Sequence, residues 1–262
     1  MATLELVRTK DQFISEAEEY LNTIRTNIQF SGNDVRVIAL TSVQPNEGKS
    51  TMSSGLAVSF AKTGYRTLLI DADTRNSVMS GTFRARERVQ GLTSYLSGNA
   101  DQQGLICDTT VENLYVIPAG QVPPNPTALL QGERFKQLIE SARSLFDYII
   151  IDTPPIGLVI DAAVVAQDVD GMVLVAAEGI ARRRFVTKAV SQLEQAGTKL
   201  LGVILNRSSE KSNGYGEYGA YGSYGEYGSY GKNAKTKKSK KAKKSKEVDT
   251  ASDGARRRRR SK

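Results

Sequence analysis

The chain has 262 residues, 39% of them hydrophobic and 7% aromatic, which is enough for one sizeable globular domain and an additional polar segment. It contains no histidine and a single cysteine, Cys107. Histidine-based zinc sites, Ser-His-Asp catalysis and an intrachain disulfide framework are thereby excluded, and so little cysteine is typical of a reducing cytosol. Catalysis would have to use carboxylates, lysines, hydroxyl groups or a bound nucleotide.

The net charge of +8 is unevenly distributed along the chain. Residues 232–262 contain 15 Lys and Arg against 3 Asp and Glu, a net charge of +12, so that residues 1–231 carry −4. A basic nucleic-acid-binding face is therefore not expected on the globular part. No secretory leader or membrane span is expected, because the most apolar stretch, 148–166, is interrupted by Asp152, Asp161 and two prolines.

Strand and helix patterns alternate through the first 207 residues. Apolar runs rich in β-branched residues predict buried strands at 35–41, 67–71, 114–118, 148–152, 171–177 and 200–206. Helical spacing occurs at 50–63, 127–145 and 182–195, with Gly64 and Gly197 placed to end two helices. The pattern predicts a doubly wound α/β domain with a mostly parallel sheet over 34–207, preceded by a helical segment, 1–33, with its helix at 10–30. We expect its ligand at the carboxyl ends of the strands.

The strongest motif is the segment Thr41–Thr51, TSVQPNEGKST, which follows the first predicted strand and opens the first helix. Gly48, Lys49 and Ser50 match the end of a P-loop, although Val43 replaces its first glycine. In such a loop, backbone N–H groups hold phosphates, the lysine reaches the β- and γ-phosphate oxygens, and the hydroxyl group binds Mg²⁺. An ordinary strand–turn–helix junction is the alternative, which the position after the first strand disfavours.

Polar side chains also end three later strands. Asp71 and Asp73 follow the second strand and, two residues apart, project to one side of an extended chain. Asp152 ends the strand at 148–152 in the sequence DTPP, as a Walker B carboxylate does. Asp-x-Asp alone is a common turn, but beside a P-loop these carboxylates are predicted to bind a metal ion and to help a hydroxyl group lose its proton. Asn206 ends the last strand, where its amide could contact a purine.

After Arg207 the composition changes abruptly. The triplet Tyr-Gly-x occurs six times in succession, which places tyrosines at Tyr215, Tyr218, Tyr221, Tyr224, Tyr227 and Tyr230. A composition so poor in aliphatic residues predicts disorder for both the tyrosine segment 208–231 and the basic segment 232–262. We interpret the repeat as a set of phosphoacceptors, because glycine leaves each phenol exposed. An aromatic–glycine spacer is the alternative.

In combination, these motifs resemble those of the bacterial tyrosine kinases (BY-kinases) that accompany capsule and exopolysaccharide assembly in Gram-positive bacteria. The likeness extends from about Phe13 to Tyr230. It includes RTNIQF at 25–30, the P-loop, the Asp71–Arg75 motif, PNP at 124–126 followed by Leu129 and Leu130, DTPP at 152–155 and the tyrosine cluster. The resemblance implies a P-loop kinase that uses ATP and Mg²⁺ to phosphorylate its own tail tyrosines.

The resemblance also implies a role for each matching residue. ATP is held by Pro45, Asn46, Glu47, Gly48, Lys49, Ser50 and Thr51, with Asn206 on the adenine. Mg²⁺ is positioned by Ser50, Asp71 and Asp152, while Asp73 accepts or orients the tyrosine hydroxyl and Lys49 completes the catalytic set. The ordinary pKa of tyrosine is about 10, so a positioned carboxylate and a metal ion matter more than prior ionisation.

The chain departs from the family pattern in two places. Family members often carry Glu-x-x-Arg-x-x-Arg in the N-terminal helix, which packs subunits into a ring, whereas this chain has Glu19, Asn22 and Arg25. The missing arginine predicts weaker oligomerisation through Glu19 and Arg25. The basic segment 232–262 is the second departure. It is interpreted either as a solvated tail or as a ligand of the anionic inner membrane surface, where each basic residue contributes about 1 kcal/mol; nucleic acid is the least favoured partner.

The predicted protein is thus a cytoplasmic tyrosine kinase, peripherally associated with the inner face of the cell membrane. By resemblance, its partners are a membrane adaptor of the polysaccharide chain-length-regulator type, a tyrosine phosphatase and other copies of itself. A ParA/MinD-like positioning ATPase is the main alternative, but such switches carry a second lysine near the start of the P-loop, where this chain has Gln44. An idle nucleotide-binding scaffold is disfavoured by the presence of Lys49, Ser50, Asp71 and Asp152.

Overall fold

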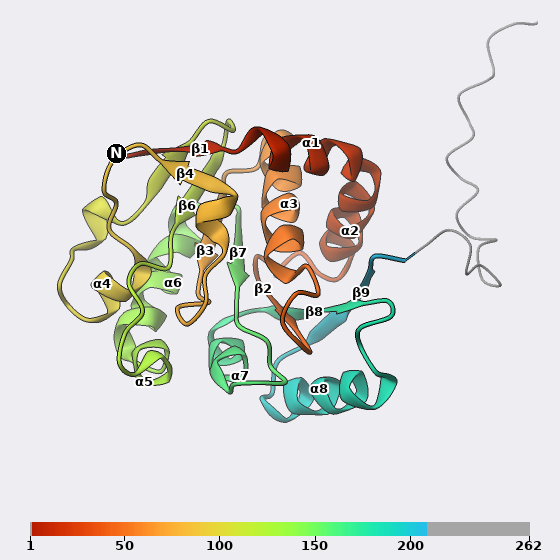
Figure 1. The fold of residues 1–262 in the computed structure, drawn as a ribbon. Coiled ribbons are helices and arrows are strands. Elements are labelled where there is room, and N and C mark those ends of the chain that lie inside the picture. The colour runs from red at the N-terminus through yellow and green to blue at the C-terminus, as the bar shows by residue number, and fades with distance from the viewer. Residues whose placement is uncertain (1, 209–262) are drawn as a thin grey trace, which may run out of the picture. The chain divides into compact units, whose positions relative to one another are not determined.

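A computed structural model describes residues 2–208 and shows them arranged around one nine-stranded sheet (Figure 1). The strands are β1 (Thr3–Leu6), β2 (Val37–Ser42), β3 (Thr67–Asp71), β4 (Phe83–Ala85), β5 (Cys107–Thr109), β6 (Leu114–Ile117), β7 (Tyr148–Asp152), β8 (Gly171–Ala177) and β9 (Leu200–Asn206). Their order across the sheet is β4-β1-β5-β6-β3-β7-β2-β8-β9. Neighbouring strands are parallel except in the β1–β4 and β5–β6 pairs, so the predicted doubly wound, mostly parallel sheet is confirmed.

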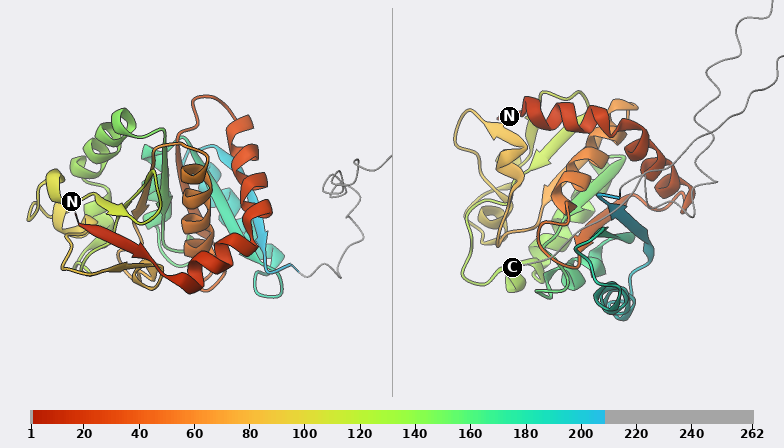
Figure 2. Two further views of the ribbon diagram at one scale, coloured as in Figure 1. Left: turned by 90° about the horizontal axis from the view of Figure 1, so that it is seen from above. Right: turned by 45° about the vertical axis from the view of Figure 1, so that its right-hand side comes forward.

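Helices cover both faces of the sheet (Figures 1 and 2). They are α1 (Arg8–Glu16), α2 (Glu18–Phe30), α3 (Lys49–Lys62), α4 (Leu92–Leu96), α5 (Pro126–Leu130), α6 (Glu133–Leu145), α7 (Asp161–Val165) and α8 (Arg183–Gln195). Three short 3₁₀ turns lie at Met79–Gly81, Gln102–Gly104 and Ala166–Asp168. Buried residues of α1, α2 and α3 belong to one hydrophobic cluster, and those of α4 to α8 to the other. No helix in the described range is both long and apolar enough to cross a membrane.

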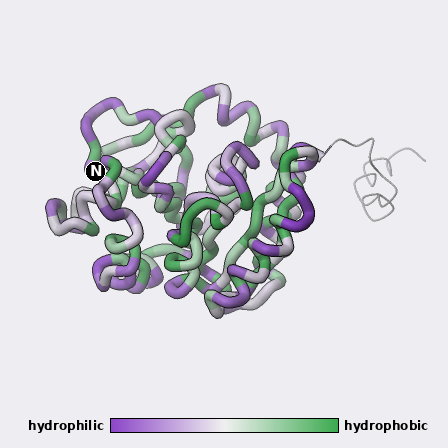
Figure 3. The backbone as a smooth tube through the Cα atoms, turned by 60° about the horizontal axis from the view of Figure 1, so that its bottom comes forward, coloured by the Kyte–Doolittle hydropathy of each residue, from purple (hydrophilic) through white to green (hydrophobic). Residues whose placement is uncertain are grey.

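Strand β2 separates the two cores because successive side chains of a strand point to opposite faces. Val37 and Ala39 belong to the cluster under α6, α7 and α8, whereas Ile38 and Leu40 belong to the cluster under α2 and α3. All four are fully buried. The hydrophobic residues accordingly follow the strands through the interior, while polar residues interrupt the outer helices (Figure 3). Burial on both faces explains why this strand is a continuous apolar run.

The structure refines several predicted boundaries. All six predicted strands are present, and Gly64 and Gly197 have φ of +90° and +81° at the ends of α3 and α8, as helix-ending glycines do. The helix expected at 127–145 is two helices, α5 and α6, because Gly132 in extended conformation stands between them. Similarly, the helix expected at 10–30 is α1 followed by α2, with Ala17 between them.

Strands β1, β4 and β5 were not predicted. Each has only three or four residues, too few for a periodic pattern, and β1 lies within the segment 1–33 that was expected to be helical. They exist because they pair with one another: Leu4 lies opposite Ala85 in the antiparallel β1–β4 pair, and Thr3 lies beside Asp108 in the parallel β1–β5 pair. The predicted tyrosine and basic segments from residue 209 onward lie outside the described residues.

Helix α2 is held against α3 by polar contacts at Ser59. Arg25 Nη1 donates to Ser59 O at 3.0 Å, and Ser59 Oγ donates to Asn22 Oδ1 at 3.0 Å. Leu21 packs closely at Gly55, where an added Cβ would lie 3.0 Å from its Cδ1. Arg25 and Asn22 therefore contact the chain's own α3, whereas Glu19, the other residue predicted for oligomerisation, is exposed.

We expect Phe60→Ala to lower the free energy of unfolding by about 3–5 kcal/mol, the usual cost of removing a buried aromatic ring. Phe60 is fully buried on α3, with its ring stacked 4.1 Å from that of Tyr148 and edge-on to Tyr65. Urea unfolding measures the loss. Phe30→Ala is the matched control, because Phe30 is 83% exposed and its removal should change stability by less than about 0.5 kcal/mol. Equal losses in the two variants would contradict the packing.

Candidate active site

The loop between β2 and α3 has the backbone conformation of a phosphate-binding turn. Asn46 and Gly48 both have left-handed φ, +64° and +91°, and Gly48 is the residue from which α3 begins. A Cβ at Gly48 would lie 2.1 Å from Asn206 Nδ2, so a side chain there is excluded by space as well as by φ. Successive turns of this kind, ending at a helix N-terminus, direct backbone N–H groups toward an anion.

Two side chains predicted to bind ATP also hold this loop in shape. Glu47 is fully buried, and its Oε2 accepts hydrogen bonds of 2.8 Å from the backbone N–H groups of Val43 and Gln44. Asn206, at the end of β9, donates from Nδ2 to Glu47 O at 2.8 Å. Neither side chain is among those that line the adjacent cavity. The structure thus gives Glu47 and Asn206 a supporting position behind the loop; the predicted contact of Asn206 with adenine stays a prediction.

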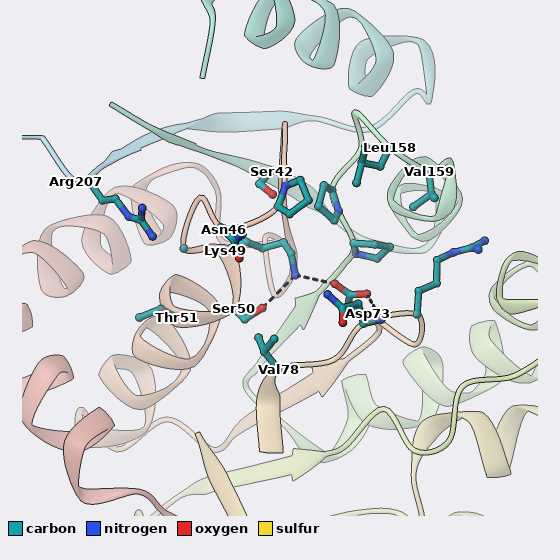
Figure 4. Close-up of a pocket in the computed structure, with 16 residues that line it drawn as sticks. Ser42, Asn46, Lys49, Ser50, Thr51, Asp73, Val78, Leu158, Val159 and Arg207 are labelled. Carbon is teal, nitrogen blue, oxygen red and sulfur yellow. Dashed lines mark hydrogen bonds and ion pairs between the residues drawn. The ribbon is translucent and has the colours of Figure 1, made fainter. Parts of the chain in front are cut away.

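Lys49, the first residue of α3, lies among carboxylates, of which Figure 4 draws that of Asp73. Its Nζ lies 3.1 Å from Asp152 Oδ2 and 3.4 Å from Asp73 Oδ2, and it donates to Ser50 Oγ at 3.2 Å. Burial alone would lower the pKa of Lys49, but the negative charges of Asp152, Asp73 and Asp71 outweigh it and raise the pKa. Lys49 is therefore a fixed cation at the carboxyl edge of the sheet.

The carboxylates of Asp71 and Asp152 repel each other. They end the adjacent strands β3 and β7 in direct register, and each is only 1% exposed. Burial, followed by the charge of Asp152, raises the pKa of Asp71 to about 7, although the hydrogen bond from Ser77 Oγ and the charge of Lys49 oppose this rise. Two carboxylates forced together in this way provide a place where added positive charge is strongly stabilising.

A cavity of about 290 Å³ opens above Lys49 (Figure 4). Of the residues predicted to bind ATP or to act in catalysis, it is lined by Pro45, Asn46, Gly48, Lys49, Ser50, Thr51 and Asp73. The loop that follows β7 contributes Pro154, Pro155, Leu158 and Val159 to the opposite wall. Asp71 and Asp152 lie beneath this surface. The fold thus brings together three segments that are far apart in the sequence, as the motifs predicted.

Three polar residues of the site were not predicted. Ser53 Oγ donates to Asp152 Oδ1 at 2.8 Å and Ser77 Oγ donates to Asp71 Oδ2, so each fixes one carboxylate. Asp161, at the start of α7, is fully buried and accepts hydrogen bonds from Arg75 Nε at 2.6 Å and Nη2 at 3.1 Å. Only Ser53 left a signal in the sequence, because it lies one helical turn after Lys49.

The donor set suits Mg²⁺. Within residues 2–208, no three His, Cys, Asp or Glu side chains are grouped so that they alone could hold a metal ion. Mg²⁺ typically takes only one or two carboxylates from a protein and completes its shell with phosphate oxygens and water. Ser50, Asp71 and Asp152 offer oxygen ligands of this kind beside the phosphate loop, so the residues present fit the ion.

The fold and the loop define a nucleotide-binding P-loop protein of the α/β class. A family model described as an AAA domain matches residues 35–200. The tyrosine-protein kinase CpsD of Streptococcus agalactiae is 57% identical over 217 residues, which cover 83% of this chain and 94% of that relative. The chain belongs to the family of bacterial capsule-type tyrosine-protein kinases, which confirms the predicted family and the predicted enzyme class.

Solved structures agree with this assignment. The chimerical protein CapA2B2 is 34% identical with a TM-score of 0.69, over 73% of this chain and 85% of that one. The septum site-determining protein MinD of Pyrococcus horikoshii, complexed with Mg-ADP, is 28% identical with a TM-score of 0.57, over 68% of this chain and 73% of that one. The predicted fold is thus shared with the MinD class, whereas sequence identity is higher with the kinases.

We expect Asp71 to lower the stability of the metal-free protein as the pH rises from 4 to 7. Its pKa is raised from 3.8 to about 7, so in this range the native state binds more protons than the unfolded chain. The stabilising contribution is therefore present below pH 4 and is lost as the pH rises through 7. The free energy of unfolding in urea at pH 7.5 minus that at pH 4.5 should be higher for Asp71→Asn than for the unaltered chain; equal differences would exclude the raised pKa.

Ser53→Ala should lower kcat/KM for the nucleotide about tenfold, because a hydrogen bond to a charged group contributes about 1.5–3 kcal/mol and Asp152 would lose one. Steady-state kinetics measure the change. Ser54→Ala is the matched control: Ser54 is also buried on α3, but its hydroxyl contacts Ser50 O and Met79 Sδ rather than a carboxylate. Comparable kinetic losses in both variants would indicate a general packing effect.

Proposed function

We propose that this kinase transfers the γ-phosphoryl group of ATP to tyrosine hydroxyls, among them those of its own tail from Tyr215 to Tyr230. The observation that carries the proposal is the position of Lys49 between Asp152 and Asp73 at the floor of the cavity. Phosphoryl transfer depends mainly on positioning and on neutralising charge. The Lys49 cation, the carboxylates of Asp152 and Asp73 and the anion-binding loop provide positioning and charge neutralisation at one cavity.

In the proposed reaction, the phosphates occupy the loop at 45–51 and Lys49 Nζ exchanges part of its contact with the carboxylates for the β- and γ-phosphate oxygens. Mg²⁺, held by Ser50, Asp71 and Asp152, would neutralise phosphate charge when bound. The incoming phenol oxygen forms a bond to the γ-phosphorus as the bond from that phosphorus to the β–γ bridging oxygen breaks and ADP leaves. Asp73, which lines the cavity, accepts the phenol proton.

Asp73 suits this role because its environment fixes its orientation. Its Oδ1 accepts a hydrogen bond of 3.1 Å from Asn76 N, while Oδ2 faces Lys49. Its own backbone N–H donates to Asp71 Oδ1 at 3.1 Å, which couples the turn that carries Asp73 to the carboxylate beneath it. A carboxylate held in this way needs no rearrangement of its own to meet an incoming hydroxyl group.

We infer the cellular setting from the family. The solved chimera is named CapA2B2, and we propose that this kinase likewise works with a CapA-type membrane adaptor at the inner face of the cell membrane, in capsule or exopolysaccharide synthesis. A tyrosine phosphatase would reverse the modification. The basic segment 232–262, with a net charge of +12, could add attraction to anionic lipid. We also propose that copies of this chain associate through α2, with the exposed Glu19 at the contact. Arg25 is less available for such a contact, because its guanidinium already donates to Ser59 O.

Lys49→Met should reduce phosphorylation of tyrosine by at least about a hundredfold, because it removes the cation that the phosphate groups require. Labelled ATP and Mg²⁺, with the membrane adaptor present, provide the assay. Lys62→Met is the matched control, since Lys62 ends the same helix with a half-exposed side chain 3.9 Å from Glu18 and should leave activity unchanged. A second variant, with all six tail tyrosines changed to Phe, should lose most self-labelling but still bind nucleotide.

The same assay separates the alternatives. Label on tyrosine supports the kinase proposal, release of free phosphate without labelled tyrosine indicates a MinD-like ATPase, and neither product indicates an idle scaffold. Self-labelling that persists in Lys49→Met would overturn the proposed role of Lys49. Labelling that persists at full strength in the six-Phe variant would place the acceptors outside the Tyr-Gly-x repeat.

A further inference from the structure

A second, larger cavity of about 570 Å³ lies beside the phosphate cavity and is not used by the proposed reaction. The two cavities share Arg75 and Asn76, which lie in the turn after β3. The second cavity also extends over β4 and the segment after β6, so it too opens at the carboxyl ends of parallel strands. Crevices at this edge of α/β sheets are where such folds bind their ligands.

The walls of this cavity are mostly apolar, and its polar side chains carry hydroxyl, amide or basic groups. The apolar residues include Leu4, Met79, Phe83, Val89, Val116 and Val122. Ser77, Ser80, Arg75 and Arg84 are among its polar lining residues. Of the residues that the structure describes, no Asp or Glu lines it. Apolar walls with a basic group at one side suit an aromatic ring that carries a negative charge.

Arg84 supplies the available positive charge. Arg75 already uses Nε and Nη2 to bind Asp161. The side chain of Arg84 is exposed on β4 and makes no hydrogen bond or ion pair with another described residue. Glu5 is its neighbour across the β1–β4 pair, but the carboxylate of Glu5 lies 3.2 Å from Arg86 instead. The guanidinium of Arg84 can therefore bind a phosphate group without breaking an existing contact.

We propose that this second cavity binds phosphotyrosine, with the ring against the apolar wall and the phosphate group on Arg84. The occupant is the Tyr-Gly-x segment of a second copy of this chain, and the inference rests on the proposed function, which creates that phosphotyrosine. Tyrosines in the repeat are three residues apart, which spans about 10 Å of extended chain. One phosphotyrosine could thus occupy the second cavity while a neighbouring tyrosine enters the first.

The consequence is that each phosphate group promotes the addition of another. A tail that already carries one phosphotyrosine would bind more tightly than an unmodified tail, and its remaining tyrosines would be held beside the γ-phosphate. Without this pocket, added negative charge would repel the tail from Asp73, which lines the first cavity. The spacing of the repeat and the adjacency of the two cavities would together make the phosphorylation of the tail progressive.

Binding can be tested without catalysis. The full-length chain with its six tail tyrosines changed to Phe is titrated, in the absence of nucleotide, with synthetic peptides of residues 214–232 that carry either tyrosine or phosphotyrosine at position 221. We expect the phosphopeptide to bind about tenfold more tightly, as one charge-assisted hydrogen bond would provide. Arg84→Ala should abolish this preference, Arg84→Lys should retain part of it, and Arg88→Ala, the matched control that removes an equal charge from an exposed residue outside the cavity, should retain all of it.

Displacement and kinetics complete the test. Free phosphotyrosine should displace the phosphopeptide at a concentration at which inorganic phosphate does not. With ATP, Mg²⁺ and the adaptor, Arg84→Ala should phosphorylate the unmodified peptide at an unchanged rate and the phosphopeptide about tenfold more slowly than the unaltered kinase does. Equal affinity for the two peptides, equal losses in Arg84→Ala and Arg88→Ala, or displacement by inorganic phosphate alone would overturn the proposal.

The outcomes also distinguish this proposal from the preceding one. Selective phosphopeptide binding without any transfer to tyrosine would mean that the kinase proposal fails while the pocket assignment stands. Transfer to tyrosine with no preference for the phosphopeptide would mean that the pocket assignment fails while the kinase proposal stands. Urea unfolding of Arg84→Ala checks that the exposed substitution has left the fold intact.

Discussion

The attraction between Lys49 and the carboxylates around it is the interaction on which the rest of the site depends. Asp71 and Asp152 are buried side by side in register, an arrangement that would be strongly unfavourable without a nearby cation. Lys49 provides that cation because it is the first residue of α3 and so stands at the carboxyl edge of the sheet. The same charge balance prepares the site for a metal ion and for phosphate groups.

Helix α3 connects this charge balance to the rest of the fold. Its first turn carries Lys49 and Ser50, its next turn supplies the Ser53 hydroxyl to Asp152, and further along Ser59 receives Arg25 and Asn22 from α2. Because α3 is buried along most of its length, these contacts form one rigid unit.

The fold of this chain is shared with MinD-type proteins, so the fold alone does not make a tyrosine kinase. Around the phosphate loop, this chain has a cavity edge that carries Asp73, an adjoining cavity with Arg84, and a tail with tyrosines at regular spacing. Two cavities that share Arg75 and Asn76 offer places for two parts of one extended segment. The kinase family assignment is thus consistent with features outside the nucleotide-binding core.

The sequence by itself determined the doubly wound sheet, the phosphate loop and the three carboxylates, because buried parallel strands are continuous apolar runs and their ends are marked by polar residues. Tertiary structure alone decided the rest. Strands β1, β4 and β5 are too short to leave a periodic signal, and Asp161 and Ser77 meet Arg75 and Asp71 only after the chain has folded. Asn206 supports the loop from behind because β9 ends there, a neighbourhood set by the order of strands in the sheet, whereas Glu47 holds the loop through local contacts with Val43 and Gln44.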